Sequence, residues 1–276
     1  MRENILEVAV GAKSIGKTFV AREIIKRYVM SDTKTGRKAR PVLIFDVNNE
    51  QLYNDYKALD FDITEEDEFK RAEEIRNITV PKPYRILPFK KNRQPMTTNE
   101  IVETCITIAK YFKNGMLILE DINKYMLSNL NVDFIGLLIG IRHKGVDLMI
   151  HYQSLAALPP RLWQNVNYIR WHKQTGNIDT FKQRIPNYEL CKLAEFIVND
   201  QFQRGNNRYY LWVGVMDEKL LNVKEEDFKN ACINYLNQNP KEIKDLQRLG
   251  TINKVNVENR ESAVAYWIQS KKHYIN

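Results

Sequence analysis

The chain has 276 residues, of which 43% are hydrophobic and 28% are charged, and its formal net charge is +8. This composition is ordinary for a globular protein, and the positive charge is compatible with a polyanionic partner without identifying one. The sequence has no apolar run of about 18 residues, and Glu3 is followed directly by a strand pattern, so neither a membrane span nor a signal peptide is expected.

The N-terminal part of the chain alternates apolar and amphipathic segments. Residues 6–10 are predicted to form a buried strand, and residues 18–29 a helix with apolar side chains at helical spacing. A polar, basic stretch over residues 31–40 leads to a second predicted strand at residues 42–47. The two strands therefore flank one helix, as in a βαβ unit.

The middle of the chain combines a charged segment with a well-marked helix start. Residues 60–84 are strongly charged and predicted to be peripheral, with a short helix over Glu65 to Ile75. Thr97 is placed as a helix N-cap with Glu100 three residues later, and this helix is predicted to run to about Phe112.

The remaining elements continue the alternation of strands and helices, which predicts an α/β fold with a mostly parallel sheet and helices on both faces. From residue 217 the chain is predicted to be helical in short pieces, broken at Pro240 and Gly250, with a final amphipathic helix over residues 262–274. The predicted domains are an ATPase domain (residues 1–216) and a helical C-terminal appendage (residues 217–276). The other predicted elements are strands at residues 116–119, 147–152, 168–172 and 209–213, and a helix at residues 134–142.

Cysteines and histidines indicate no disulfide framework and no zinc site. Cys105, Cys191 and Cys232 are far apart and include no Cys-x-x-Cys pair, and the four histidines lack metal-ligand spacing. Buried thiols in a reducing cytoplasm are expected.

Residues 11–18 match the phosphate-binding motif G-x-x-x-x-G-K-[ST] in full, between a predicted strand and a predicted helix. Such a loop wraps a phosphate with backbone N–H groups, and the helix N-terminus adds its positive end. Lys17 is predicted to neutralise β- and γ-phosphate oxygens of ATP, and the Thr18 hydroxyl to bind Mg²⁺. The predicted nucleotide-binding residues are Gly11, Ala12, Lys13, Ser14, Ile15, Gly16, Lys17 and Thr18.

Two loop residues leave alternatives open. Ser14 stands where many such loops have a third glycine, so this loop must tolerate a side chain there. Lys13 is a second cation, which either remains solvated or reaches the γ-phosphate as a stabiliser in the same chain.

Glu120 and Asp121 close an apolar strand roughly a hundred residues after Lys17, where a Walker B element is expected. One carboxylate is predicted to hold Mg²⁺ and the other to activate the attacking water. The usual order is Asp then Glu, and here it is reversed. By position, Glu120 takes the metal role and Asp121 the role of base.

Other polar residues near the predicted strand ends are further candidates. Gln153 follows the strand at residues 147–152 and is predicted to contact the γ-phosphate or the lytic water. Arg142, Arg161 and Arg170 are candidates for an arginine presented to a neighbouring subunit's nucleotide, with Arg142 preferred and Arg170 second. An ordinary surface ion pair explains each arginine equally well.

The succession of residues 11–18, 42–50, 117–121 and 141–153 resembles the FtsK–HerA group of DNA-pumping ATPases. The most specific part is Arg142-His143-x-Gly145-x-Asp147, leading into a strand that ends at Gln153. In that group the segment carries an arginine finger before the strand and a polar sensor after it, and these roles are carried onto Arg142 and Gln153. The group's Asp-x-x-x-Glu is matched by Asp46 and Glu50, without an assigned role.

Within the group, the loop cation Lys13 and the short chain are most similar to viral genome-packaging ATPases, while Ser14 and the inverted Glu120-Asp121 depart from the common pattern. The resemblance implies an ASCE/RecA-like P-loop NTPase fold, ATP and Mg²⁺ as cofactors, and a homomeric ring of five or six subunits. It also implies double-stranded DNA and a capsid portal or vertex as partners, in the host-cell cytoplasm or associated with the virion. Two basic loops, residues 34–40 and 90–93, are candidates for DNA contact or equally for solvated surface.

Rival functions remain open. A nucleotide-gated assembly factor would bind ATP without moving DNA, and a filamentous-virus assembly or conjugation-type motor would need a membrane anchor. A small-molecule kinase is disfavoured because no Arg-rich lid follows the core.

Overall fold

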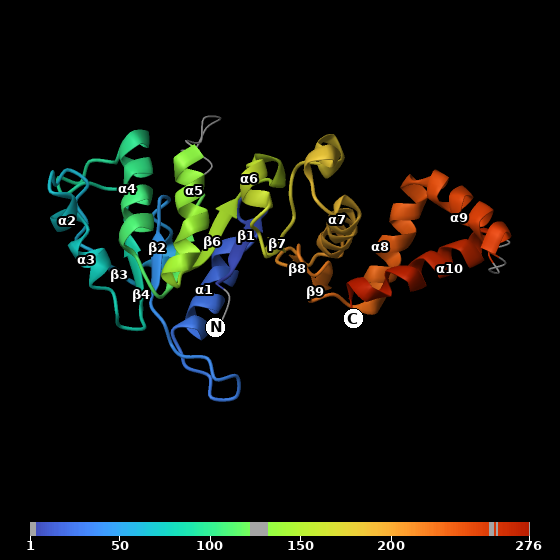
Figure 1. Cartoon of the computed structure of the whole chain (residues 1–276), viewed down its shortest axis with the longest axis horizontal. Helices are drawn as coiled ribbons and strands as arrows, with labels where there is room; N and C mark the ends of the chain where they lie inside the picture. Colours follow the sequence, from blue (N-terminus) through green and yellow to red (C-terminus); the bar gives the residue numbers. More distant parts are fainter. Residues whose placement is uncertain (1–3, 122–131, 254–256, 258, 276) are drawn as a thin grey trace. The chain divides into compact units, whose positions relative to one another are not determined.

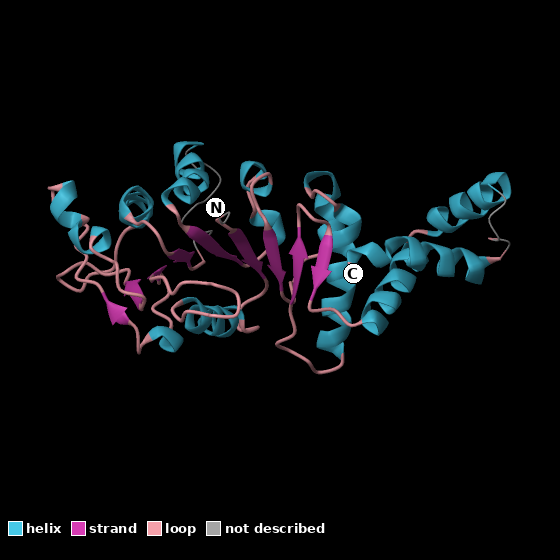
Figure 2. Cartoon of the chain, turned by 60° about the horizontal axis from the view of Figure 1, so that its bottom comes forward, coloured by secondary structure: helices cyan, strands magenta, loops and turns pink. Residues whose placement is uncertain are grey.

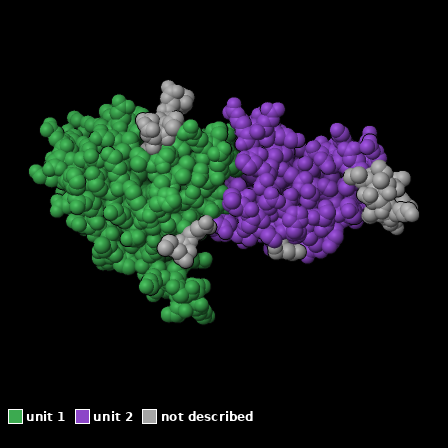
Figure 3. Space-filling view, in the orientation of Figure 1, with its two compact units in different colours: residues 1–167 green, residues 168–276 purple. Residues whose placement is uncertain are grey.

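The computed structural model describes residues 4–121, 132–253, 257 and 259–275. The chain divides into two compact units, unit 1 (Met1–Asn167) and unit 2 (Tyr168–Asn276), coloured green and purple in Figure 3. The domain boundary predicted at residues 216/217 falls inside unit 2, between two hydrogen-bonded strands, β8 (Leu211–Gly214) and β9 (Lys219–Leu221).

Unit 1 is an α/β unit whose described strands all pair in parallel, in the order β3-β4-β2-β5-β6-β1. The strands are β1 (Leu6–Val10), β2 (Val42–Phe45), β3 (Lys57–Ala58), β4 (Pro83–Ile86), β5 (Met116–Leu119) and β6 (Asp147–Tyr152). The helices are α1 (Lys17–Tyr28), α2 (Glu68–Arg71), α3 (Glu73–Arg76), α4 (Thr98–Tyr111), α5 (Val132–Gly140) and α6 (Pro160–Trp163). Short 3-10 segments are η1 (Gln51–Tyr53), η3 (Ile141–Lys144) and η4 (Leu155–Ala157).

Both faces of this sheet are covered, as predicted. Alternate residues of β2, such as Val42 and Ile44, pack in one cluster with Ala21 and Ile25 of α1. Leu43 and Phe45 point to the opposite face because side chains alternate along a strand, and they are equally buried. Helices lie on both sides of the strands in Figure 2, which explains why the strands are apolar throughout rather than alternating.

The predicted elements of unit 1 are found within a few residues of their expected bounds. The N-cap of α4 is Thr97, and Thr97 and Glu100 form the predicted capping box. The predicted helix over residues 65–75 is instead two short helices, α2 and α3, meeting at Ala72.

The sequence analysis missed β3 and β4, which lie in the segment expected to be peripheral. β4 begins with Pro83 and carries Arg85, two residues that weaken a strand pattern. Arg85 is nonetheless buried, because its guanidinium lies 3.4 Å from the buried carboxylate of Asp46 at the end of β2. A charge partner distant in sequence therefore made this strand possible.

Unit 2 combines a small antiparallel sheet with helices. β7 (Tyr168–Trp171), β8 and β9 pair in antiparallel fashion, so the strand predicted at residues 209–213 begins two residues later than expected. The rings of Tyr235 and Trp267 stack between α8 and α10 at 5.3 Å. The other elements are η5 (Ile178–Arg184), α7 (Tyr188–Gln203), α8 (Glu225–Gln238), α9 (Pro240–Asn253), α10 (Arg260–Lys271) and η6 (Lys272–Tyr274), labelled in part in Figure 1.

The helix α9 departs from the sequence prediction. α9 starts at Pro240, a residue suited to the first turn, but it continues past Gly250 to Asn253, so the predicted break there is wrong.

All three cysteines are free and buried, and burial raises the pKa of Cys191 to about 12. Among the described helices, none has both the length and the apolar character needed to cross a membrane.

Candidate functional site

The phosphate-binding motif forms the turn between β1 and α1. Gly11 N–H donates to the Tyr152 carbonyl (3.1 Å), which fixes the loop start beside the end of β6. Gly16 is the N-cap of α1 with φ of 96°, a conformation that glycine adopts without strain. Ser14 has φ of 64° and an exposed side chain, so the loop accommodates a non-glycine residue at this position.

The loop presents unused hydrogen-bond donors. From Ala12 to Gly16, no backbone N–H donates to another described atom. Lys17 Nζ, which is mostly buried, donates to the carbonyls of Gly11 (2.6 Å) and Ala12 (2.8 Å), so a cation lies within the loop. Such donors at a helix N-terminus form an anion site.

The side chains of two further loop residues form no hydrogen bond or ion pair with the residues that the structure describes. The Thr18 hydroxyl makes no hydrogen bond to the described part of the chain. Lys13 is exposed and forms no ion pair with any described residue. Thr18 therefore fits a Mg²⁺ ligand, and both interpretations of Lys13 stay open.

Glu120, directly after β5, is buried and held on both carboxylate oxygens. Tyr53 OH donates to Oε1 (2.6 Å), and His151 Nδ1 lies 2.7 Å from Oε2. Burial opposes ionisation of Glu120, but the His151 charge and the hydrogen bonds from His151 and Tyr53 outweigh it, and the pKa of Glu120 is lowered. Each oxygen keeps one lone pair, so the predicted metal role of Glu120 stays compatible with this geometry.

Removing the Tyr53 hydroxyl tests its hydrogen bond to Glu120. Tyr53→Phe is expected to destabilise the fold by about 1–3 kcal/mol, because a buried carboxylate loses a donor. Urea denaturation followed by circular dichroism measures it. Tyr56→Phe is the matched control, since Tyr56 stacks on Tyr53 and its buried hydroxyl has no partner among the described residues. Equal losses in both variants would contradict the assigned bond.

Asp121 accepts hydrogen bonds from the side-chain amides of Asn48 and Gln153. Its Oδ2 accepts from Asn48 Nδ2 (3.2 Å) and from Gln153 Nε2 (3.3 Å). Asp121 has φ of 42°, a left-handed conformation in which the chain leaves the strand direction directly after Glu120. Because Gln153 follows the Tyr152 carbonyl that binds Gly11, the predicted base and sensor lie at the same edge of the sheet as the phosphate loop.

A buried polar row underlies this edge. The register pairs Phe45 with Leu119 and Leu119 with Ile150, so the following residues Asp46, Glu120 and His151 align across β2, β5 and β6. Burial raises the pKa of Asp46 to about 6, and the nearby Glu120 charge adds to this shift.

This raised pKa gives stability a pH dependence. The folded protein holds the Asp46 proton more tightly than the unfolded chain, so the contribution is present below about pH 4 and is lost as pH rises through about 6. Asp46→Asn cannot ionise, so between these pH values its stability relative to wild type is expected to rise by up to about 3 kcal/mol. Urea denaturation across pH measures this difference. The exposed Asp60→Asn is the control, and a pH-independent difference for Asp46→Asn would refute the assignment.

The three candidate arginines lie in different environments. Arg142 is in η3, half-buried, and donates to Asn165 Oδ1 (3.0 Å). It precedes β6, whereas the phosphate loop follows β1, and the two strands run in parallel. Arg142 therefore lies at the amino edge of the sheet, about 20 Å from the loop by strand length. Arg161 is exposed on α6, and Arg170 is fully buried on β7, which disfavours its presentation to another subunit.

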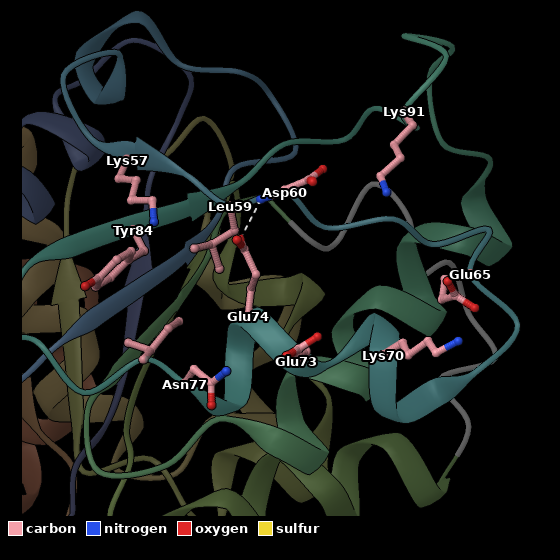
Figure 4. A pocket seen from close by; sticks show the side chains of 11 residues that line it. Lys57, Leu59, Asp60, Glu65, Lys70, Glu73, Glu74, Asn77, Tyr84 and Lys91 are labelled. Atoms are coloured by element: carbon pink, nitrogen blue, oxygen red, sulfur yellow. Dashed lines mark hydrogen bonds between the residues drawn. The ribbon is translucent and has the colours of Figure 1, made fainter.

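A separate cavity lies at the far edge of unit 1. It measures about 570 Å³ and is lined by β3, β4 and α3 (Figure 4). Lys57 lies over the Tyr84 ring, and the Glu74 carboxylate accepts the Asp60 N–H (2.6 Å). Three lysines and four carboxylates line it, so it favours neither sign of charge. The strand order places β3 five strands from β1, and this cavity is distinct from the phosphate loop.

Sequence reasoning missed Tyr53 and His151, and gave Asn48 no role. His151 is the penultimate residue of β6, at the strand end that carries Gln153, and this position beside a predicted site residue was an available signal. No local signal identifies Tyr53, since only the fold brings η1 against Glu120.

No protein-family model and no curated protein sequence matches this chain. The DNA-packaging ATPase from Sulfolobus Turreted Icosahedral Virus is 14% identical with a TM-score of 0.50, over 80% of this chain and 97% of that chain. The genome packaging NTPase from Sulfolobus turreted icosahedral virus 2, in complex with ATP-gammaS, is 15% identical with a TM-score of 0.46, over 80% and 96%. The N-terminal domain of zonular occludens toxin from Neisseria meningitidis is 12% identical with a TM-score of 0.33, over 61% and 76%.

The first of these structures shows a shared fold across nearly the whole relative. The predicted α/β fold with a mostly parallel sheet is confirmed, and the chain shares this fold with a viral DNA-packaging ATPase. This chain has the fold of a P-loop NTPase.

Proposed function

We propose that this chain is an ATPase that moves double-stranded DNA as a homomeric ring, packaging a viral genome. One observation carries the ATPase part of the proposal. The loop with unpaired N–H groups and the Asp121–Gln153 pair lie together at the carboxyl edge of one parallel sheet. Ligands bind at this edge in open α/β sheets.

The loop supplies the binding half of the site. The N–H groups of Ala12 to Gly16 receive the β-phosphate, and Lys17 exchanges its carbonyl partners for phosphate oxygens. Thr18 and Glu120 would hold Mg²⁺, and the hydrogen bonds from Tyr53 and His151 would orient the Glu120 carboxylate. When bound, the ion neutralises charge on the β- and γ-phosphate oxygens.

Asp121 and Gln153 carry out the hydrolysis step. Asp121 takes a proton from water as the water oxygen bonds to the γ-phosphorus and the bond from that phosphorus to the β-phosphate oxygen breaks. ADP and inorganic phosphate are the products. Gln153, bonded to the same Asp121 oxygen, orients the water and senses its conversion.

The proposed ring assembly and DNA binding are supported by other observations. Arg142 lies at the edge of the sheet opposite its own phosphate loop, so as an arginine finger it would act on the nucleotide of a neighbouring subunit. The net charge of +8 suits a polyanion, and the relative sharing this fold is a DNA-packaging ATPase. A capsid portal or vertex is the docking partner proposed for such a ring.

Steady-state ATP hydrolysis with and without double-stranded DNA tests the proposal. DNA is expected to stimulate turnover, and turnover per subunit is expected to rise with protein concentration as rings assemble. If ATP hydrolysis does not respond to DNA and no DNA binds at low salt, the proposed DNA-moving activity is refuted and a nucleotide-gated assembly factor is favoured. Absence of ATP binding would sink the ATPase itself.

A further inference from the structure

A hairpin after α1 projects from the body of unit 1. Asp32 and Arg37 exchange two backbone hydrogen bonds of 2.8 and 3.0 Å, closing a four-residue turn. Gly36 completes this turn with φ of 68°, a value that favours glycine. The hairpin is the blue loop at the bottom of Figure 1 and the green projection at the bottom of Figure 3.

Two arginines tie the hairpin to the fold. Arg37 donates to the Arg27 carbonyl (2.7 Å) at the end of α1. Arg40 donates to the Gly145 carbonyl and to the Tyr28 hydroxyl (3.1 Å), and lies 3.5 Å from buried Asp147. These contacts fix the base of the hairpin to unit 1.

Two lysines on the hairpin have no side-chain partner among the described residues. Lys34 and Lys38 are exposed, and the side chain of neither forms an ion pair or hydrogen bond with any described residue. Lys113, also exposed and unpaired among the described residues, comes just before β5, near the base of the hairpin. Its neighbour Asn114 and the hairpin residue Arg40 both meet Gly145.

The second basic loop, residues 90–93, differs in its electrostatics. Lys90 is paired with Glu100 at 2.8 Å, and Lys91 lies 3.9 Å from Asp62. Lys90 is therefore neutralised by a close carboxylate, and Lys91 has a more distant one, whereas Lys34 and Lys38 have no ion-pair partner among the described residues. The sequence left the two loops equal, and the structure distinguishes them by their ion pairs.

The hairpin is also separate from the nucleotide site. α1 has 12 residues, so about 18 Å of helix separates the phosphate loop at its start from the hairpin after its end. A ligand on the hairpin leaves the loop accessible.

We propose that Lys34 and Lys38 bind the phosphate backbone of double-stranded DNA, with Lys113 adding a third contact on the same edge. This inference rests on the proposed DNA-moving function and names the surface that holds the DNA. Ammonium groups contact phosphates without reading bases, so binding is sequence-independent and weakens with salt. We take a DNA duplex as the occupant because its closely spaced phosphates offer charge to several cations at once, and these lysines form no ion pair with a described carboxylate.

Binding of fluorescein-labelled duplex DNA, followed by anisotropy over a range of KCl concentrations, tests this surface. Lys34→Ala/Lys38→Ala is expected to bind on the order of 10–100-fold more weakly at 0.1 M salt, with the slope of log K against log[salt] reduced by roughly 2. Lys91→Ala/Arg93→Ala removes the same charge from the second loop and is expected to bind like wild type. Lys34→Arg/Lys38→Arg is expected to restore binding. ATP hydrolysis without DNA is expected to be unchanged in all of these variants, which shows that they fold.

The possible failures are distinguishable. Wild-type affinity and salt slope in Lys34→Ala/Lys38→Ala overturn this inference and leave the proposed function standing. Equal losses in the two alanine pairs also overturn it, because any two cations would then suffice. Competition by poly-glutamate as strong as that by DNA, lost in the same variant, would assign the hairpin to an acidic protein. Wild-type protein that hydrolyses ATP but binds no DNA overturns both the inference and the DNA part of the proposed function.

Discussion

Replacing Asp121 by asparagine is expected to lower the turnover of ATP about 10²- to 10⁴-fold while leaving ATP binding intact. The introduced amide has nearly the shape of the carboxylate and still allows contacts with Asn48 and Gln153, so the loss comes from the missing base rather than from the fold. Steady-state ATPase assays give the rate, and titration with a fluorescent ATP analogue gives the affinity.

Two other carboxylates serve as comparisons. Asp60→Asn, at an exposed position in the separate cavity, is expected to hydrolyse ATP like wild type. Glu120→Gln is expected to lose both activity and stability, because it changes the buried carboxylate that contacts His151 and Tyr53. A fully active Asp121→Asn would remove Asp121 from the base role, and Glu120 would then be the remaining candidate.

Arg142→Ala is expected to lower turnover about 10³-fold or more in the assembled ring, the effect of removing an arginine that stabilises transition-state charge in trans. Arg142 lies at the amino edge, away from its own phosphate loop, so the proposed effect requires the nucleotide of a neighbouring subunit. ATP binding to the isolated subunit is expected to be unchanged.

Mixing two inactive variants separates action in trans from action in cis. In an equal mixture of Arg142→Ala and Asp121→Asn subunits, about a quarter of the interfaces in a closed ring join an intact Asp121 to an intact Arg142. Activity is therefore expected to reappear on mixing. Arg161→Ala, exposed on a neighbouring helix, is the matched control. No recovery on mixing, with each variant still able to assemble, would contradict a trans role for Arg142.

Much of the fold was predictable because its signals are local. The phosphate loop is defined by residues within one stretch of eight, and the strands at β1, β2, β5 and β6 are apolar because helices cover both faces. The capping box at Thr97 and Glu100 is likewise a matter of three residues' spacing. The signals failed where a residue's partner was distant, as for Arg85 on β4, whose charge is tolerated only beside Asp46.

The sequence by itself determined the phosphate loop, the succession of strands and helices, and the expectation that Glu120 and Asp121 end a core strand. Only the tertiary structure decided how these two carboxylates differ. Glu120 points into the interior between Tyr53 and His151, whereas Asp121, in a left-handed conformation, meets Asn48 and Gln153. It also decided that Lys34 and Lys38 stay unpaired among the described residues while Lys90 is neutralised by Glu100. The physical reason is the same in each case, since a charge acts according to what surrounds it, and residues far apart in the chain supply those surroundings.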